Sequence, residues 1–318
     1  MDIGIVGLGH LGKIHLKLLN EINGFNVSAI FDIDKTAMIA CNKQYQVKMA
    51  DSYDELLDLC EAVCVVTPTP THFELASLAI KSGKHVFIEK PATDDLGDTK
   101  KLLKLAREAD VKVQVGHVER FNPAFIAAKD YIKDPLLFEI QRLACYNKRG
   151  TDVSVILDLM IHDIDLVLSI VKSKIKRISS TGSCIVSTTP DFANTRIEFE
   201  NGCIANLTAN RVAFKNLREM RVFEKNTFTS IDLLNKSAGV HKIQPLSTKH
   251  NGILIDTGDN CQKYEILQLH PVIQPINAIK TELEFFHQSI IQNTDVAVSL
   301  MDAETALFVA KEIESQIP

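Results

Sequence analysis

The sequence lacks the excess of basic residues that most nucleic-acid-binding proteins carry. Its 318 residues include 35 Lys and Arg against 40 Asp and Glu, which gives a net charge of -5. A general nucleic-acid binder usually presents a basic field, so we expect no nucleic-acid partner. The composition, with 46% hydrophobic and 24% charged residues, is that of an ordinary soluble globular protein, and the length predicts two domains.

Long apolar runs are also missing. No stretch of about 18 residues is apolar and uncharged enough to span a bilayer, and there is no internal repeat or low-complexity tract. The chain opens on the strand-like segment MDIGIVGLG with no cationic segment before it. We therefore expect no signal peptide, no membrane partner and a cytoplasmic location.

The seven cysteines do not form a zinc pattern. Cys60 and Cys64 are the closest pair, and no second pair completes a set of ligands. We interpret them as reduced, mostly buried thiols and predict no metal site.

The first half of the chain alternates apolar strands with amphipathic helices. This order is typical of βαβ units and of a parallel sheet that is covered on both faces. The predicted strands are residues 2–7, 26–32, 62–67, 84–89 and VKVQVG, and the predicted helices are residues 10–22, 34–43, THFELASLAIKSG and DTKKLLKLAREAD.

The segment GLGHLG joins the first predicted strand to the first predicted helix. In a G-x-G-x-x-G motif at this place, Gly7 allows a tight turn, Gly9 lets the backbone approach a pyrophosphate, and Gly12 lets helix and strand pack closely. The phosphates would lie at the positive end of the helix dipole. A glycine-rich turn without function is the alternative, and the strand before the motif and the helix after it argue against that reading.

The second strand ends in Asp32, which follows Gly12 by 20 residues. That is the expected place for a carboxylate that binds the ribose hydroxyls of a dinucleotide. Asp34 adds a second negative charge, and no arginine is near to accept a 2'-phosphate. NAD is therefore favoured over NADP as the cofactor.

The segment EKP ends a buried strand with an acid, a base and a rigid imino acid. Ligands of open α/β sheets bind outside the carboxyl ends of the strands, so Lys90 is expected near the nicotinamide end of the cofactor. An ammonium group there can polarise a carbonyl or stabilise an alkoxide. Pro91 fixes the backbone, and the bond before it is a candidate cis peptide. From spacing alone, a surface lysine paired with Glu89 fits equally well.

The motifs GLGHLG, TPTPTH, EKPAT and GHVERFNP, in this order, resemble the glucose–fructose oxidoreductase and inositol dehydrogenase family (Gfo/Idh/MocA). The resemblance implies an NAD-binding Rossmann domain over residues 1–120. It implies an α+β domain for substrate binding and oligomerisation, with an open, largely antiparallel sheet, over residues 121–318. It also implies that Lys90 is catalytic. The residues expected to bind the cofactor are Gly7, Gly9, His10, Leu11, Gly12, Asp32, Thr67, Pro68, His72, Glu89 and Lys90.

The second half begins with a strand, LLFEIQRLACY, and continues with DVSVILDLMIHDIDLVLSIVKS, which we predict to be a buried helix. At about 100° per residue, its polar residues fall within an arc of about 80°. The residues of this polar stripe are Ser154, Asp158, His162, Asp165 and Ser169. Buried carboxylates are costly unless they are paired, so the stripe should face a cleft or form a satisfied structural network. Without a second histidine at ligand spacing, a metal site is disfavoured.

The family has the same stripe as D-x-G-x-H-x-x-D, with Asp158, His162 and Asp165 in place and Met160 where many relatives have glycine. By resemblance His162 exchanges a proton with the substrate hydroxyl, and Asp158 positions the substrate or takes part in catalysis. A neutral imidazole near pH 7 suits that proton exchange.

Residues 175–232 are predicted to be short strands, with a hairpin turn at Asn201-Gly202. Two amphipathic helices, PINAIKTELEFFHQSI and SLMDAETALFVAKEIESQ, close the chain. In the family the flat face of this sheet is the usual place for oligomer contacts, so we expect a homodimer or homotetramer.

The segments YNKRGTDVSVILDLMIHDIDL and NRVAFKNLREMRVF narrow the resemblance to the branch that oxidises UDP-N-acetylglucosamine at the sugar 3-hydroxyl. Basic side chains suit a pyrophosphate, although each one taken singly could equally be a solvated surface charge. Those considered are Arg120, Lys148, Arg149, Arg211, Lys215 and Arg218. The expected substrate-binding residues are Lys90, Arg120, Arg149, Asp158 and His162.

The expected function is therefore an NAD-dependent dehydrogenase that acts on the secondary alcohol of a sugar or sugar nucleotide. Three alternatives remain open. They are a dehydrogenase of a free sugar or inositol, a glycosidase that uses NAD for transient oxidation, and a non-catalytic dinucleotide-binding regulator. The presence of both Lys90 and His162 argues against the regulator.

Overall fold

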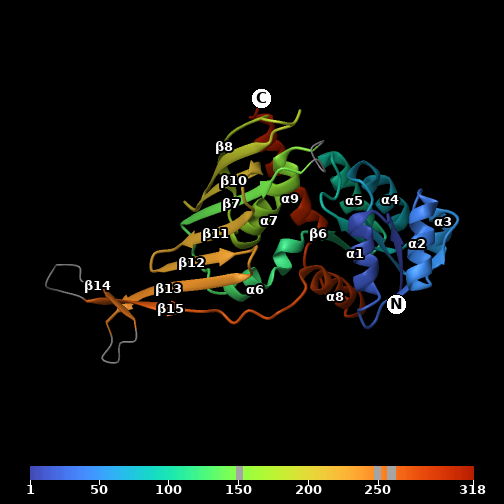
Figure 1. Ribbon diagram of the computed structural model, residues 1–318, viewed down its shortest axis with the longest axis horizontal. Helices are drawn as coiled ribbons and strands as arrows, with labels where there is room; N and C mark the ends of the chain where they lie inside the picture. Colours follow the sequence, from blue (N-terminus) through green and yellow to red (C-terminus); the bar gives the residue numbers. More distant parts are fainter. Residues whose placement is uncertain (148–152, 247–251, 256–262) are drawn as a thin grey trace. The chain divides into compact units, whose positions relative to one another are not determined.

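The computed structural model describes residues 1–147, 153–246, 252–255 and 263–318. The chain divides into two compact units (Figure 1). The first contains Met1–Val118 and Ile276–Phe308, and the second contains Glu119–Pro275 and Val309–Pro318. From sequence, every residue after 120 is expected in the second domain, whereas residues 276–308 return to the first unit.

The first unit is built on a six-stranded sheet in the order β3-β2-β1-β4-β5-β6. All of its neighbouring strands are parallel, which is the predicted Rossmann arrangement. The order reverses between β1 and β4, and ligands of such sheets bind at that switch point. The strands are β1 (Asp2–Val6), β2 (Asn26–Phe31), β3 (Lys48–Met49), β4 (Ala62–Val65), β5 (His85–Glu89) and β6 (Val113–Gly116).

Helices pack on this sheet through apolar faces. Helix α8 adds Leu283 and Phe286 to the core beside Ile5 and Leu16, so its apolar face explains why residues 276–308 belong here. The helices are α1 (His10–Leu19), α2 (Lys35–Tyr45), α3 (Tyr53–Asp58), η1 (Thr69–Thr71), α4 (His72–Lys81), α5 (Leu96–Glu108) and α8 (Ala278–Ile291). Helix α9 (Leu300–Ser315) begins in the first unit and ends in the second.

The second unit is built on a nine-stranded sheet in the order β14-β15-β13-β12-β11-β7-β10-β9-β8. Its pairs are antiparallel except β7 with β10, so the predicted fold class is confirmed. The strands are β7 (Leu137–Cys145), β8 (Ile175–Ser183), β9 (Phe192–Phe199), β10 (Ile204–Ala213), β11 (Leu217–Phe223), β12 (Thr227–Asp232), β13 (Ser237–Pro245), β14 (Ile253–Ile255) and β15 (Tyr264–Leu269). The turn between β9 and β10 contains Gly202 at φ +88°, as expected for the Asn201-Gly202 hairpin.

One face of this sheet is buried. Residues alternate along β9 and β10, so that Ile197 and Leu207 are inside while Arg196 and Asn206 are not. Helix α6 (Pro123–Lys129) packs on β12 and β13, while the π-helical turn η3 (Ile156–Met160) and α7 (Ile161–Ile170) pack on β10. The short helix η2 (Val118–Phe121) precedes α6.

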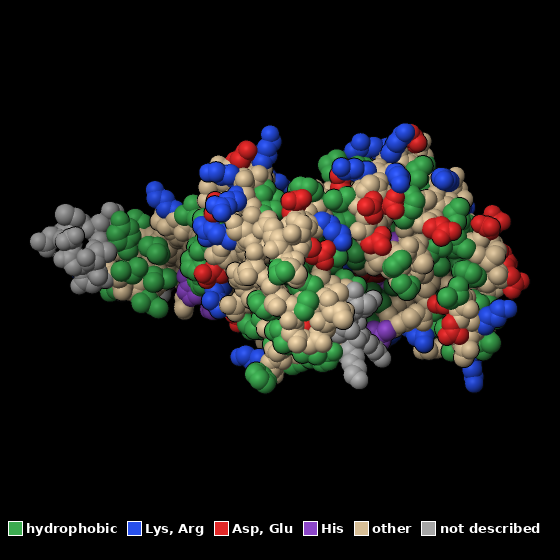
Figure 2. Space-filling view, turned by 90° about the horizontal axis from the view of Figure 1, so that it is seen from above, with side chains coloured by type: hydrophobic (Ala, Val, Ile, Leu, Met, Phe, Trp, Pro, Cys, Tyr) green, Lys and Arg blue, Asp and Glu red, His purple; other side chains and the backbone are tan. Residues whose placement is uncertain are grey.

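Strands β13, β14 and β15 extend from the rest of this sheet as an arm (Figure 1). Apolar side chains gather on the arm in the space-filling view (Figure 2). Ile253 and Leu254 are 58% and 56% exposed. The arm therefore carries apolar surface that its own unit leaves exposed.

Candidate active site

A cavity of about 780 Å³ lies in the first unit, where the loops after β1, β4 and β5 meet the end of β2. Residues of all four segments line it. From the predicted cofactor-binding set these are Gly7, Gly9, His10, Leu11, Asp32, Thr67, Pro68, His72, Glu89 and Lys90. Gly12 lies in the first turn of α1 and is not among the lining residues. The geometry thus brings together a set of residues that the sequence spreads over more than a quarter of the chain.

The three glycines of the motif differ in what they permit. Gly7 has φ +93°, and a Cβ there would lie 2.6 Å from the Val66 carbonyl oxygen. A Cβ on Gly12 would lie 2.0 Å from the Gly7 oxygen, so this position holds the helix tightly against the turn. A Cβ on Gly9 would meet nothing within 4 Å. The space over Gly9 is what a bound pyrophosphate requires, and the turn therefore fits NAD.

Asp32 supports the glycine turn and faces the cavity. One carboxylate oxygen accepts a bond from the Leu8 N–H at 2.5 Å, and the other accepts from the Asp34 N–H at 2.8 Å. A carboxylate has about four lone-pair sites, so these two bonds leave acceptor capacity for the ribose hydroxyls. Among the described residues that line the cavity there is no arginine, which fits NAD better than NADP.

Lys90 follows β5 at the edge of the cavity, and its bond to Pro91 is cis. The neighbouring Glu89 carboxylate accepts bonds from the His15 Nε2–H at 2.8 Å and from the Lys90 backbone N–H at 3.2 Å. His72 contacts the Pro91 carbonyl oxygen through Nδ1 at 3.0 Å and the Thr67 carbonyl oxygen through Nε2 at 2.7 Å. The backbone around Lys90 is thus tied to two helices, α1 and α4.

Sequence reasoning missed His15. This side chain is 0% exposed, and it lies between Glu89 and the thiol of Cys64, 3.6 Å from its Nδ1. Burial raises the pKa of Glu89, but the hydrogen bond from His15 and the bond from the Lys90 N–H outweigh it, so the net shift is downward and the carboxylate is ionised. The sequence signal is a histidine on the apolar side of the helix that contains Gly12.

In the second unit the predicted polar stripe is divided between two environments. The helix is not α-helical throughout, because it begins with the π turn η3. Turns of this kind are frequent at functional sites, and the spacing of about 100° per residue does not apply across it. Ser154 is buried and donates to Glu314, and Ser169 donates to the Leu166 carbonyl.

Asp165 is also buried and holds Arg120 in a bidentate ion pair. The two N···O distances are 2.7 and 2.6 Å. Asp158 and His162, to which catalytic roles were assigned, are only partly buried. The stripe is therefore neither wholly a cleft lining nor wholly a structural network.

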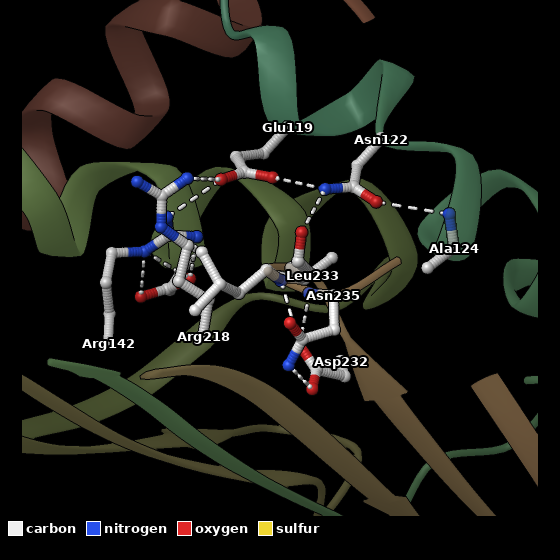
Figure 3. A network of polar contacts seen from close by, with 10 residues as sticks. Glu119, Asn122, Ala124, Arg142, Arg218, Asp232, Leu233 and Asn235 are labelled. Carbon is white, nitrogen blue, oxygen red and sulfur yellow. Dashed lines mark hydrogen bonds and ion pairs between the residues drawn. The ribbon is translucent and has the colours of Figure 1, made fainter. Parts of the chain in front are cut away.

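A second buried ion network, centred on Glu119, was not anticipated (Figure 3). The Glu119 carboxylate accepts hydrogen bonds from Arg142 at 2.8 Å, from Asn122 at 3.0 Å and from Arg218 at 3.3 Å. Arg142 also donates to the Asp163 carboxylate. Burial raises the pKa of Glu119, but the charge and hydrogen bond of Arg142, together with the contacts of Arg218 and Asn122, outweigh it, so the net shift of the pKa is downward. Asp163 follows His162 in sequence, but the helical spacing of the sequence does not predict its ion pair with Arg142 of β7.

The basic residues that were expected to bind a pyrophosphate lie in different surroundings. Lys148 and Arg149 lie outside the described residues. Arg211 does not form a basic surface, because it is 5% exposed and its Nε donates to Asp191 at 2.8 Å. Arg218 is 45% exposed at its side chain while bonding Glu119.

No helix of the described chain is long and apolar enough to cross a membrane. Within the same described ranges, no group of three or more His, Cys, Asp or Glu side chains could hold a metal ion.

Comparison with known proteins gives the same fold. Residues 1–117 match the profile of an oxidoreductase family with an NAD-binding Rossmann fold, and residues 137–226 match the GFO/IDH/MocA C-terminal domain. A UDP-N-acetylglucosamine 3-dehydrogenase of Acidithiobacillus ferrooxidans is 33% identical over 246 residues, which cover 76% of this chain and 77% of that protein. The chain belongs to the Gfo/Idh/MocA family. It is an NAD-binding dehydrogenase that acts on CH–OH groups.

Other similarities agree with this assignment. A solved structure of the Acidithiobacillus ferrooxidans enzyme superposes with a TM-score of 0.90 at 28% identity and covers 100% of this chain and 97% of that one. A myo-inositol 2-dehydrogenase of Thermotoga maritima is 28% identical over 198 residues, which cover 58% of this chain and 59% of that protein.

Proposed function

We propose that the protein oxidises a secondary hydroxyl of a sugar nucleotide, and that its substrate is UDP-N-acetylglucosamine, oxidised at the sugar 3-hydroxyl. One observation carries the chemistry: Lys90 lines the same cavity as the glycine turn and Asp32. The identity of 33% to a UDP-N-acetylglucosamine 3-dehydrogenase, over 76% of the chain, supports the choice of substrate.

NAD, when bound, supplies the hydride acceptor. We assign to His162 the removal of the hydroxyl proton while the hydride leaves the same carbon, so that the alcohol becomes a ketone and the products are NADH and a proton. The ammonium group of Lys90 steadies the oxygen as negative charge develops on it, because a fixed positive charge stabilises an alkoxide. Asp158, four residues before His162, positions the substrate or assists in catalysis.

Lys90, Arg120, Arg149, Asp158 and His162 are proposed to bind the substrate. Asp165 holds the guanidinium of Arg120 at two points, so Arg120 would act from a fixed position. The proposal for Arg149, which lies outside the described residues, rests on resemblance.

A free inositol is the second candidate substrate, since inositol dehydrogenases are among the relatives at 26–29% identity. Pyrophosphate contacts remote from the reacting carbon provide binding energy that orients it. We therefore expect UDP-N-acetylglucosamine to be oxidised at least about tenfold more efficiently, in kcat/KM, than free N-acetylglucosamine or an inositol.

The test is NADH formation from NAD with each compound, in the presence of a carbonyl trap because alcohol oxidation near neutral pH is uphill. The product should be the 3-keto sugar by mass and NMR. Lys90→Met is the background control and should lower kcat at least about a hundredfold. If an inositol or a free sugar is the better substrate, the nucleotide-sugar assignment fails while the dehydrogenase class remains.

We also propose that the protein forms a homodimer or homotetramer through the open face of the second-unit sheet. The polar residues that alternate with the buried ones on β7, β10 and β11 support this choice, since they lie together on the face opposite the buried one.

A further inference from the structure

Both residues that flank Lys90 are held by a buried histidine. On one side, His15 of α1 donates to the Glu89 carboxylate at 2.8 Å. On the other, His72 at the start of α4 contacts the Pro91 carbonyl at 3.0 Å. The two imidazoles are 0% and 1% exposed. Burying a polar ring is costly unless it is bonded, and both rings have bonding partners next to Lys90.

The two neighbours of His15 suggest which of its ring nitrogens donates and which accepts. Burial raises the pKa of the Cys64 thiol well above its ordinary value, so sulfur keeps its proton and can donate to the His15 Nδ1. Nε2 then carries the ring hydrogen and donates to the ionised Glu89. A neutral ring of one tautomer therefore satisfies both contacts.

His72 has two carbonyl oxygens as partners, from Thr67 and Pro91. Carbonyls only accept, so the neutral ring bonds one of them at a time and the imidazolium bonds both. In either state the ring spans the gap between the loop after β4 and the loop after β5.

We propose that His15 and His72 are positioning residues that hold the backbone on either side of Lys90 and so fix its ammonium group in the cofactor cavity. This rests on the proposed catalytic role of Lys90. Helix α1 follows the glycine turn, and α4 follows the TPTPTH loop. The pair of histidines consequently ties the lysine to the two segments that border the dinucleotide, and a misplacement of about 1 Å at such a site can cost about a hundredfold in rate.

The kinetic test replaces His15 by leucine, which removes the bond to Glu89, and by glutamine, whose amide can still donate to it. His15→Leu should lower kcat about ten- to a hundredfold with the Kd for NAD changed less than about threefold, and His15→Gln should recover most of that loss. His72→Leu should lower kcat similarly. Equal kcat in His15→Leu and the wild type would overturn the proposal.

A double-mutant cycle separates this proposal from the role of Lys90. Because His15 acts through the lysine, His15→Leu should have no further effect on kcat in a Lys90→Met protein. Additive losses would overturn the positioning role. If Lys90→Met alone leaves kcat unchanged, the catalytic assignment fails independently of His15.

A readout without substrate uses ¹³C-dimethylated lysines observed by NMR, with the Lys90 signal assigned by its absence in Lys90→Met. His15→Leu and His72→Leu should shift or broaden this signal, and His15→Gln should keep it close to the wild-type position. His85→Gln is the matched control. His85 lies at the opposite end of the same strand and accepts a bond from the Lys112 N–H at 3.0 Å, so kcat and the Lys90 signal should not change. A Lys90 signal that is the same in all four variants would contradict the proposal.

Discussion

At the residue scale, Asp32 has two roles, one in the structure of the glycine turn and one in the choice of cofactor. Its carboxylate bonds the Leu8 and Asp34 N–H groups and so shapes the turn. It also puts negative charge in the cofactor cavity, where we propose that the adenosine ribose of a dinucleotide binds. A 2'-phosphate there would meet a like charge at close range, while two ribose hydroxyls would find an acceptor.

Asp32→Ser should therefore narrow the preference for NAD. Two unit charges about 4 Å apart interact by about 1–4 kcal/mol in surroundings from water to a protein surface, so the ratio of the Kd values for NADP and NAD should fall about ten- to a hundredfold. Both affinities should drop because the Leu8 N–H loses its partner. The measurement is calorimetric titration with each dinucleotide.

Asp34→Ser is the matched control for that experiment. Asp34 also lines the cavity, but its side chain caps α2 by accepting from the Thr36 N–H at 2.9 Å, a bond that serine can replace. Its effect on the ratio should be smaller. Should Asp32→Ser leave the ratio unchanged, or wild-type protein bind NADP as tightly as NAD, repulsion at Asp32 is not what selects the cofactor.

Residue chemistry was predictable from sequence where it depends on local context. Asp32 and Lys90 follow apolar strands, and the carboxyl ends of parallel strands share an edge, so their meeting in one cavity could be expected. The partners of Glu89 and Glu119 could not, because His15 and Arg142 are 74 and 23 residues away in sequence. The hydrophobic periodicity of a sequence does not show which buried carboxylate pairs with which basic side chain.

At the element scale, the turn between β1 and α1 shows why one motif needs three glycines for different reasons. Gly7 and Gly12 are required by the fold of the free protein, since a Cβ at either would press on backbone oxygen. Gly9 has φ -64°, which any residue can adopt, and open space beyond its Cα. The fold of the free protein therefore does not require glycine at this position, and we propose that its lack of a side chain makes room for the ligand.

Gly9→Ala and Gly12→Ala should accordingly separate binding from stability. Gly9→Ala should keep the melting temperature of the free protein and weaken NAD binding at least about tenfold, as the added methyl group occupies the approach of the pyrophosphate. Gly12→Ala should lower the melting temperature by roughly 2–10 °C, because overpacking costs about 1–3 kcal/mol. Thermal unfolding with and without NAD measures both effects. Normal NAD binding by Gly9→Ala would mean that the cofactor does not pass over this backbone.

The helical segment that contains Asp158 and His162 was predicted only in part from its hydrophobic pattern. Its apolar composition predicted a buried helix, and α7 is one. The π turn η3 changes the angular spacing just before His162. A π turn of five residues is too short to produce a recognisable periodicity in the sequence. A stripe drawn at a constant angle per residue therefore groups side chains that face different surroundings.

At the scale of the whole molecule, the division into two units departs from chain order. The chain leaves the first unit at Val118 and re-enters it at Ile276. The amphipathic pattern of α8 predicts that a face is buried but not which core receives it. Only the packing of Leu283 and Phe286 with the strands of the first unit decides that.

The open face of the second-unit sheet bears on the state of assembly. Alternation along β7, β10 and β11 puts Phe138, Leu207 and Val222 inside. The opposite face has a shallow hollow of about 280 Å³ lined by polar side chains, among them Glu139, Gln141, Asn206, Thr208, Glu219 and Arg221. A twofold interface on this face would bring the same patch of each copy together.

Light scattering should therefore give a mass of two or four chains of 35.4 kDa. Thr208→Lys puts a charge on the self-contacting face, where desolvation without a partner is costly, and should shift the mass to a smaller assembly with its melting curve still cooperative. Thr305→Lys, the same exchange at an exposed position of α9, should not. A wild-type mass of one chain would remove the oligomer proposal. An unchanged assembly in Thr208→Lys would move the interface to another surface, of which the apolar arm around Ile253 and Leu254 is the next to probe.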